Sequence, residues 1–258
     1  MPETDLALLI RAARAAGEIA TGFRGETARR WDKSGDAGPV TEADLAVNDM
    51  LFRELRTARP DYGWLSEESE DDLARLQQEH VFIVDPIDGT RSFIEGSRTW
   101  AHALAVAQRG VVTAAVVYLP LRDKLYSAAA GEGARLNGRQ IRVSGATELP
   151  GASVLAARPA FAPEFWRADP PEVSRSLRPS LAYRTSLVAE GRFDAMLTIR
   201  PTWEWDVAAG DLILREAGAV TSDRTARALR FNNKLPQVNG VLAANPVLHG
   251  KIVSELAE

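Results

Sequence analysis

Two aspartates that directly follow an apolar run are the residues of this sequence best suited to chemistry. Residues 81–84 (VFIV) predict a buried strand that delivers Asp85 to the edge of a sheet, and Asp88 follows three residues later. Two carboxylates held close together cannot both stay ionised without a cation. Because oxygen-only ligands select hard ions, the pair indicates a site for Mg²⁺, Mn²⁺ or Ca²⁺ rather than for zinc.

The residues between and after these aspartates favour a bound phosphate. Pro86 turns the chain, and Gly89 lets the backbone approach a ligand closely. Thr90 supplies a hydroxyl and a backbone N–H group. If a helix begins here, its free N–H groups and the positive end of its dipole attract an anion. A hard cation beside such an anion site is the equipment for phosphoryl-group hydrolysis.

Further acidic residues stand where other predicted elements begin or end. Glu67 and Glu68 follow a short apolar run. Asp44 lies in the first turn of one predicted helix, and Asp206 opens another. Taken singly, each has a simpler interpretation: Asp-Pro and Asp-Gly pairs form turns, Glu-Glu pairs are solvated, and an aspartate before a helix is an N-cap. Only agreement among the motifs distinguishes a site from these alternatives.

The composition narrows the function classes. The chain has 258 residues with 31 Lys and Arg, 35 Asp and Glu, 3 His and no Cys, for a net charge of −4. The lack of Cys excludes disulfides, Cys-bound zinc, iron–sulfur clusters and thiol nucleophiles, and three scattered His disfavour a His-built metal site. The acidic balance disfavours nucleic acid as a partner. The acidic N-terminus and the short apolar runs predict a cytoplasmic protein with no membrane span.

The elements that must position the acidic residues fall into two halves. Helical spacing of apolar residues predicts a helix after Thr4 or Asp5, and a capping-box-like start at residues 41–44 predicts a second helix that Pro60 ends. Residues 100–143 predict an antiparallel meander. The rest alternates strands with helices, which indicates a layered α/β fold. We therefore expect an α+β domain over residues 1–145 and an α/β domain over residues 146–258, with a loop or a mobile hairpin at residues 24–39 and a surface loop at residues 158–180.

The order and spacing of the acidic motifs resemble the inositol monophosphatase superfamily, the Mg²⁺-dependent, lithium-sensitive phosphomonoesterases. The family pattern is an upstream Asp, then Glu-Glu, then Asp-Pro-(Ile/Leu)-Asp-Gly-(Thr/Ser), then Trp-Asp-x-x-Ala-Gly. In this sequence the motifs are Asp44, Glu67-Glu68, residues 85–90 (DPIDGT) and residues 205–210 (WDVAAG). The resemblance runs from the first predicted helix to the last. It implies an αβαβα layered sandwich and a homodimer.

The resemblance also implies a metal site with two to three Mg²⁺ ions, which Mn²⁺ can replace. One ion is assigned to Glu67, Asp85 and the backbone carbonyl of Ile87. A second is assigned to Asp85, Asp88 and Asp206, and a weaker third to Glu67 with water. The cations would lower the pKa of water and stabilise the leaving oxygen.

Catalytic and phosphate-binding roles follow from the same resemblance. Thr90, paired with Asp44, would orient and help deprotonate a water molecule beside Glu67. This water would attack phosphorus in line with the departing alkoxide, with no covalent enzyme intermediate. The amides of Gly89 and Thr90 would bind the phosphate.

Local features resemble the 3′(2′),5′-bisphosphate nucleotidase branch most. Leu65-Ser66 precedes the Glu pair, and Ile199 stands near the place where inositol-specific members have a substrate-binding Glu. Arg184, on the predicted substrate helix, would contact a second phosphate, and Glu204 would lie at the substrate rim. These features favour 3′-phosphoadenosine 5′-phosphate, hydrolysed to AMP, as the substrate.

Other substrates and another class of function remain open on the sequence. Ile87 and residues 131–138 are more typical of the inositol branch, so inositol 1-phosphate or another sugar or histidinol phosphate is the alternative substrate. Arg184 and Glu204 also fit an exposed surface, and Lys33 fits either a loop closing over the site or the surface. The other-class alternative is a non-catalytic regulator that binds RNA polymerase or RNA on the same fold. The intact acidic set favours catalysis.

Overall fold

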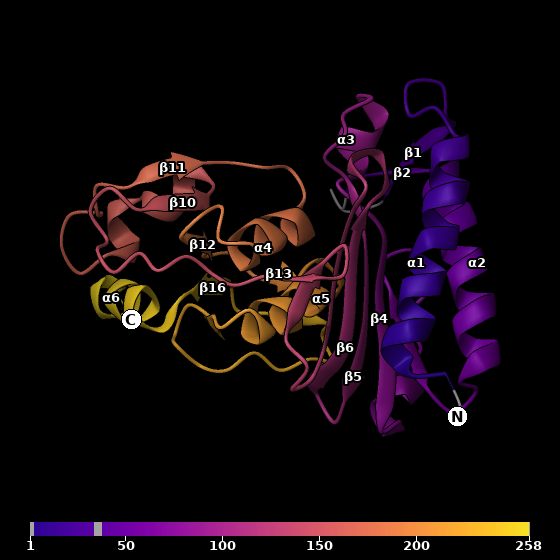
Figure 1. Ribbon diagram of the computed structural model, residues 1–258. Helices are drawn as coiled ribbons and strands as arrows, with labels where there is room; N and C mark the ends of the chain where they lie inside the picture. Colours follow the sequence, from indigo (N-terminus) through magenta and orange to yellow (C-terminus); the bar gives the residue numbers. More distant parts are fainter. Residues whose placement is uncertain (1–2, 34–37, 258) are drawn as a thin grey trace.

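The computed structural model describes residues 3–33 and 38–257, and its elements form five stacked layers (Figure 1). Two helices cover one face of a large sheet, two more helices lie between this sheet and a smaller one, and a last helix covers the smaller sheet. This arrangement confirms the expected αβαβα sandwich. The helices are α1 (Asp5–Gly22), α2 (Glu42–Ala58), α3 (Thr90–Ile94), α4 (Leu181–Ala189), α5 (Glu204–Glu216) and α6 (Pro246–Glu255).

The large sheet has seven strands in the order β3-β4-β5-β6-β7-β8-β9. Strand β3 is parallel to β4, and the remaining neighbours pair antiparallel, as the meander pattern predicts. The strands are β3 (Gly63–Ser66), β4 (His80–Asp88), β5 (Ala101–Gln108), β6 (Val111–Leu119), β7 (Lys124–Ala129), β8 (Ala134–Leu136) and β9 (Arg139–Gln140).

The smaller sheet has five strands in the order β11-β10-β12-β16-β14. Its strands are β10 (Ser153–Ala156), β11 (Ser174–Ser176), β12 (Ala195–Thr198), β14 (Val220–Ser222) and β16 (Val241–Ala244). Strand β11 lies inside residues 158–180, so the expectation of a loop there is wrong at this edge strand, whose three residues lack an apolar pattern. Two short pairs complete the strands: β1 (Arg30–Asp32) with β2 (Pro39–Thr41), and β13 (Thr202–Trp203) with β15 (Gln237–Val238).

The helix starts near the site follow from local capping. Thr41 is the N-cap of α2 and forms a capping box with Asp44, as its sequence predicts. Helix α5 begins at Glu204, with Trp203 as its N-cap. Asp206 is therefore in the first turn of α5 and is not its N-cap, which leaves its side chain available for another role. None of the described helices is long and apolar enough to cross a membrane.

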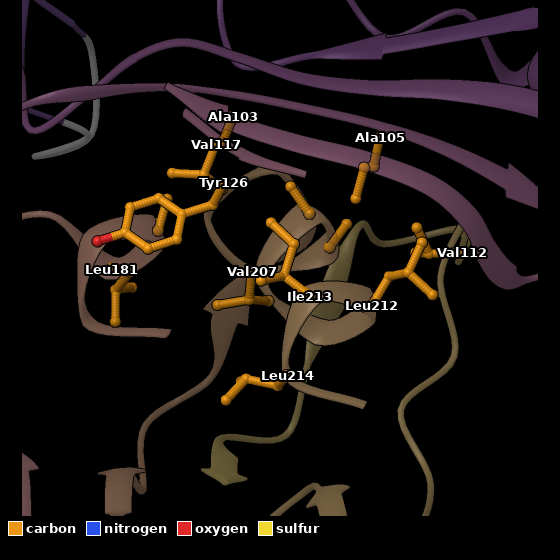
Figure 2. Close-up of a cluster of buried hydrophobic side chains, with 14 of the residues drawn as sticks. Ala103, Ala105, Val112, Val117, Tyr126, Leu181, Val207, Leu212, Ile213 and Leu214 are labelled. Atoms are coloured by element: carbon orange, nitrogen blue, oxygen red, sulfur yellow. The ribbon is translucent and has the colours of Figure 1, made fainter. Parts of the chain in front are cut away.

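The middle layer joins the two sheets through one apolar core. Figure 2 shows Ala103 and Val117 of the large sheet facing Val207 and Ile213 of α5, while Leu214 points away from that sheet. The same core includes buried residues of β10, β12 and β16. Helix α5 thus packs on both sheets. The strands of the two sheets fall on either side of residues 141–152, while the division into domains at residue 145 stays a prediction.

Candidate active site

The site begins at an irregularity in β4, where the strand carries its two aspartates. Asp85 pairs with Ala103 of β5 and Asp88 with Ala101, with a shift of register between the two pairs. The predicted strand end at Asp85 is therefore three residues early. Pro86 cannot donate to the ladder, which produces a bulge rather than a stop. Oδ1 of Asp85 accepts a hydrogen bond from the N–H of Ile87 at 3.0 Å, which fixes the carboxylate at the bulge.

Buried His102 of β5 contacts the backbone of the bulge. Its Nδ1 lies 2.5 Å from the carbonyl oxygen of Pro86, and its Nε2 has no hydrogen-bond partner among the described residues. Burial lowers the pKa of His102 to about 4, so the ring is neutral near pH 7. A neutral ring that contacts the Pro86 carbonyl through Nδ1 carries its proton there and donates it to the carbonyl.

Gly89 follows the bulge and starts α3. Its φ of +96° lies in the left-handed region, where a side chain costs free energy, so glycine is required at this turn. Helix α3 has only five residues, so the predicted anion attraction by a helix dipole is weak here. The N–H groups of its first turn still have no partner within the helix.

Thr90 and Asp44 form the predicted pair. The Thr90 hydroxyl lies 3.1 Å from Oδ1 of Asp44 and 3.1 Å from the carbonyl oxygen of Ile87. Oδ2 of Asp44 accepts a hydrogen bond from the N–H of Thr41 at 2.8 Å. Burial raises the pKa of Asp44, against the lowering effect of the hydrogen bonds from Thr41 and Thr90. The pair thus holds a threonine hydroxyl against a buried carboxylate of raised basicity.

Asp85, Asp88 and Asp206 come together at the junction of the two halves. A carboxylate oxygen from each lies within 4.8 Å of the others. Asp85 is only 1% exposed and Asp88 only 7% exposed, whereas Asp206 is partly exposed. Burial and the neighbouring negative charges raise the pKa of Asp85 and of Asp206 well above the ordinary value. A cluster of oxygen ligands with this mutual repulsion fits a hard divalent cation.

Asp88 also connects the cluster to α4. Its Oδ2 accepts hydrogen bonds from the hydroxyl of Ser180 at 2.7 Å and from the N–H of Ala182 at 2.5 Å. Burial raises the pKa of Asp88 to about 6, against these hydrogen bonds and the positive charge of Arg184. The carboxylate therefore fixes the start of α4 next to the cluster.

Glu67 lies near the cluster but bonds elsewhere. Its negative charge is, after burial, the largest cause of the raised pKa of Asp85. Its Oε1 accepts a hydrogen bond from Nζ of Lys33 at 2.8 Å, and Oε1 of Glu68 lies 2.6 Å from the same ammonium. Burial and the charge of Glu67 raise the pKa of Glu68 to about 7. The surface interpretation of Lys33 is therefore wrong, because its ammonium caps the glutamate pair.

The two predicted substrate contacts differ in outcome. Arg184 is half-buried, and its positive charge opposes the rise in the pKa of Asp206. It therefore lies beside the cluster rather than on an exposed helix face. Glu204 is fully buried, and its oxygens accept hydrogen bonds from the N–H groups of Asn232 and Asn233 at 2.6 and 2.9 Å. The expectation that Glu204 binds substrate is wrong, because both of its oxygens hold this loop. Because Asn232 and Asn233 are far from Glu204 in the chain, no local sequence pattern indicated this contact.

Comparisons with known proteins agree with this geometry. The model of the inositol monophosphatase family matches residues 1–258. An inositol-1-monophosphatase of Mesorhizobium japonicum is 33% identical over 94% of this chain and 92% of its own, and the Nus factor SuhB of Escherichia coli is 32% identical over 93% and 91%. The crystal structure of SuhB from Bartonella henselae superposes with a TM-score of 0.81 at 30% identity, covering 96% of each chain. The chain belongs to the inositol monophosphatase family, a family of metal-dependent phosphatases.

Proposed function

We propose that this phosphatase hydrolyses small phosphate monoesters with Mg²⁺ held by Asp85, Asp88 and Asp206. The observation that carries the proposal is the meeting of these three carboxylates, whose oxygens lie within 4.8 Å of one another. Bound divalent cations would lower the pKa of water and neutralise charge on the leaving oxygen. Mn²⁺ is an alternative because it accepts the same oxygen ligands.

We assign Glu67 and the Ile87 carbonyl to a neighbouring cation position. The Ile87 carbonyl oxygen lies 3.1 Å from the Thr90 hydroxyl, so it points toward the catalytic pair. The contact of Lys33 with Oε1 of Glu67, at 2.8 Å, would compete with a cation for that oxygen. On this assignment the ammonium of Lys33 neutralises the glutamate in the metal-free protein.

Thr90 and Asp44 are the proposed proton-handling groups. The Thr90 hydroxyl donates its hydrogen bond to Asp44, which leaves an oxygen lone pair on Thr90 to accept a proton from the attacking water. Asp44 can then take up the threonine proton, and its raised pKa favours this role. The free N–H groups of Gly89 and Thr90 would hold the phosphate at the start of α3.

The relatives bear on the choice of substrate. Two bacterial relatives are named inositol-1-monophosphatase, which favours inositol 1-phosphate as a candidate. The predicted preference for 3′-phosphoadenosine 5′-phosphate finds no parallel in those names, so it depends on local residues alone. These are Leu65-Ser66 before the Glu pair, Arg184 on α4, and Ile199 near the position where inositol-specific members carry a glutamate. Both esters therefore belong in the same assay.

A regulatory role is a second candidate, because several relatives are named Nus factor SuhB. On this chain such a role would add to hydrolysis, since the acidic cluster is complete. Binding of RNA polymerase in a pull-down with purified protein tests it.

The predicted homodimer is tested by light scattering.

The decisive assay is phosphate release from a panel of esters with and without Mg²⁺. We expect release only with the cation, and Asp88→Asn to lower it on the order of 100-fold or more because a ligand is lost. Asp49→Asn, at an exposed aspartate of α2, is the matched control and should leave the rate unchanged. Mg²⁺-independent release, or full activity of Asp88→Asn, would overturn the proposal.

A further inference from the structure

A cavity beside the acidic cluster has a lining that the hydrolytic chemistry does not require. Its volume is about 450 Å³, within the usual range for small-molecule sites. Its cationic lining residues are Arg184, Arg200 and Arg224. Phe165, Leu177 and Ile199 contribute to an apolar wall. No Asp or Glu lines it among the described residues.

Two segments of the wall lead directly into the cluster. Arg184 is on α4, two residues after Ala182, whose N–H donates to Asp88. Residues 198–201 line the cavity and lead through β13 into the first turn of α5, which carries Asp206. The charges of Arg184 and Arg200 both act to lower the pKa of Asp206. The cavity is therefore next to the place where the phosphate would be cleaved.

The three arginines keep donors available for a ligand. None of them has an ion-pair partner among the described residues. The Arg184 guanidinium donates to the backbone carbonyls of Arg178 and Pro179, which orients its plane and leaves further N–H groups free. Arg200 and Arg224 are exposed. A neutral polyol would give the guanidinium groups of this cavity no charged partner, whereas an anion would supply one.

We propose that this cavity binds the leaving group of the substrate and selects one that carries a second anionic group beside an apolar part. The proposal rests on the proposed phosphatase function and names its substrate class. Arg184 and Arg200 would bind the second anionic group, a phosphate or a carboxylate, through bidentate hydrogen bonds. In the reaction, water adds to phosphorus as the phosphorus–oxygen bond of the ester breaks. The leaving oxygen takes a proton, and the second anionic group is unchanged.

Matched ester pairs test the selectivity. Adenosine 3′,5′-bisphosphate and adenosine 3′-phosphate differ only in a second phosphate, and 3-phosphoglycerate and glycerol 3-phosphate differ at a carboxylate. We expect kcat/KM to be on the order of 10-fold higher for the more anionic member of at least one pair, which also identifies the anion. Equal or lower values in both pairs, or a clear preference for inositol 1-phosphate, would overturn the proposal.

Variants locate the effect in the cavity. Arg184→Gln and Arg200→Gln should each lower, on the order of 10-fold, the ratio of kcat/KM for the preferred ester to kcat/KM for its partner without the second anionic group. The ester without the second anionic group reports on folding, because a misfolded variant would lose both activities. Arg53→Gln, at an exposed arginine of α2, is the matched control. Equal losses on both esters would contradict a role in selectivity.

A metal-free readout separates this proposal from the proposed function. Calorimetry on protein in EDTA would compare the product AMP with adenosine, and glycerate with glycerol. We expect the anionic product of the preferred pair to bind on the order of 10-fold tighter than its neutral partner, and Arg200→Gln to remove the difference. If no ester is hydrolysed, the proposed function fails, and this measurement still decides whether the arginine cavity recognises anions. Equal binding in both pairs would overturn the inference alone.

Discussion

The two halves of the site differ in how firmly their polar groups are held. On the side of the seven-stranded sheet, which we call the rigid half, Asp44, Asp85 and Thr90 are buried and hydrogen-bonded within the protein. On the side of the five-stranded sheet, Arg200 and Arg224 are exposed and line an open cavity. Reaction chemistry needs groups fixed in advance, whereas selection of a leaving group needs space and charge. This difference fits our two proposals, in which one half carries the reaction and the other the selectivity.

Asp206 is the exception that joins the halves. It comes from the C-terminal half, yet its carboxylate lies with Asp85 and Asp88. Helix α5 can carry it because this helix packs on both sheets. The alignment of the two halves therefore controls whether the third carboxylate reaches the cluster.

The largest effect should come from removing this link. We expect Asp206→Asn to lower kcat on the order of 100-fold or more, because a cation ligand is lost. In EDTA the same variant should unfold at a higher temperature than wild type, because repulsion among raised-pKa carboxylates is relieved. Activity assays and thermal unfolding measure the two effects. Asp169→Asn, at an exposed aspartate of the same half, is the control, and a lower melting temperature for Asp206→Asn in EDTA would contradict the repulsion argument.

The next effect concerns the rigid half alone. Thr90→Val keeps the shape of the side chain and removes the hydroxyl that donates to Asp44, so kcat should fall on the order of 100-fold with a smaller change in KM. Thr90→Ser should recover most of the activity because it restores the hydroxyl. Steady-state kinetics on both variants check this, and equal loss in Val and Ser would mean that only packing matters.

A pH effect on stability should also arise in the rigid half. The pKa of His102 is lowered from 6.5 to about 4, so neutral His102 contributes stability above pH 6.5 that is lost as the pH falls toward 4. The full window corresponds to about 3 kcal/mol. We expect urea unfolding in EDTA to show a larger loss of stability between pH 7 and pH 4.5 for wild type than for His102→Gln. Equal losses would show that His102 does not titrate in this range.

A smaller effect separates structure from recognition at Glu204. Glu204→Gln removes the charge that the loop N–H groups of Asn232 and Asn233 contact, and should cost about 1–2 kcal/mol of stability. KM for every ester should stay unchanged, because the side chain is buried away from the substrate. Urea unfolding and kinetics check both, with Glu132→Gln as an exposed control. A raised KM with unchanged stability would restore the substrate role.

The smallest effect tests whether Lys33 opposes cation binding. Lys33→Gln removes the ammonium that contacts Glu67 and Glu68, so the Mg²⁺ concentration for half-maximal activity should fall about 3- to 10-fold. Lys33→Arg keeps the charge and should stay close to wild type. A Mg²⁺ titration of activity distinguishes the variants, and a higher Mg²⁺ requirement in Lys33→Gln would mean that Lys33 assists binding.

Local patterns predicted much of the fold and of the rigid half. Capping by Thr41 and Asp44, the meander of residues 100–143 and the glycine turn at Gly89 depend on neighbours in the chain, so the sequence alone determines them. The acidic motif at residues 85–90 could also be recognised in the sequence, because its residues are adjacent in the chain. Their assigned roles in catalysis stay predictions that the experiments above address.

Long-range contacts decided what the sequence did not. Glu204 bonds to a loop 28 residues further along the chain, and Lys33 reaches Glu67 across 34 residues, so no local pattern indicated either contact. The bulge that extends β4 to Asp88 needs its pairing with β5. The sequence by itself determined which oxygen ligands and turn residues exist. Only the tertiary structure decided which of them meet and which charges surround them, because burial and Coulomb interaction depend on distance in space and not along the chain.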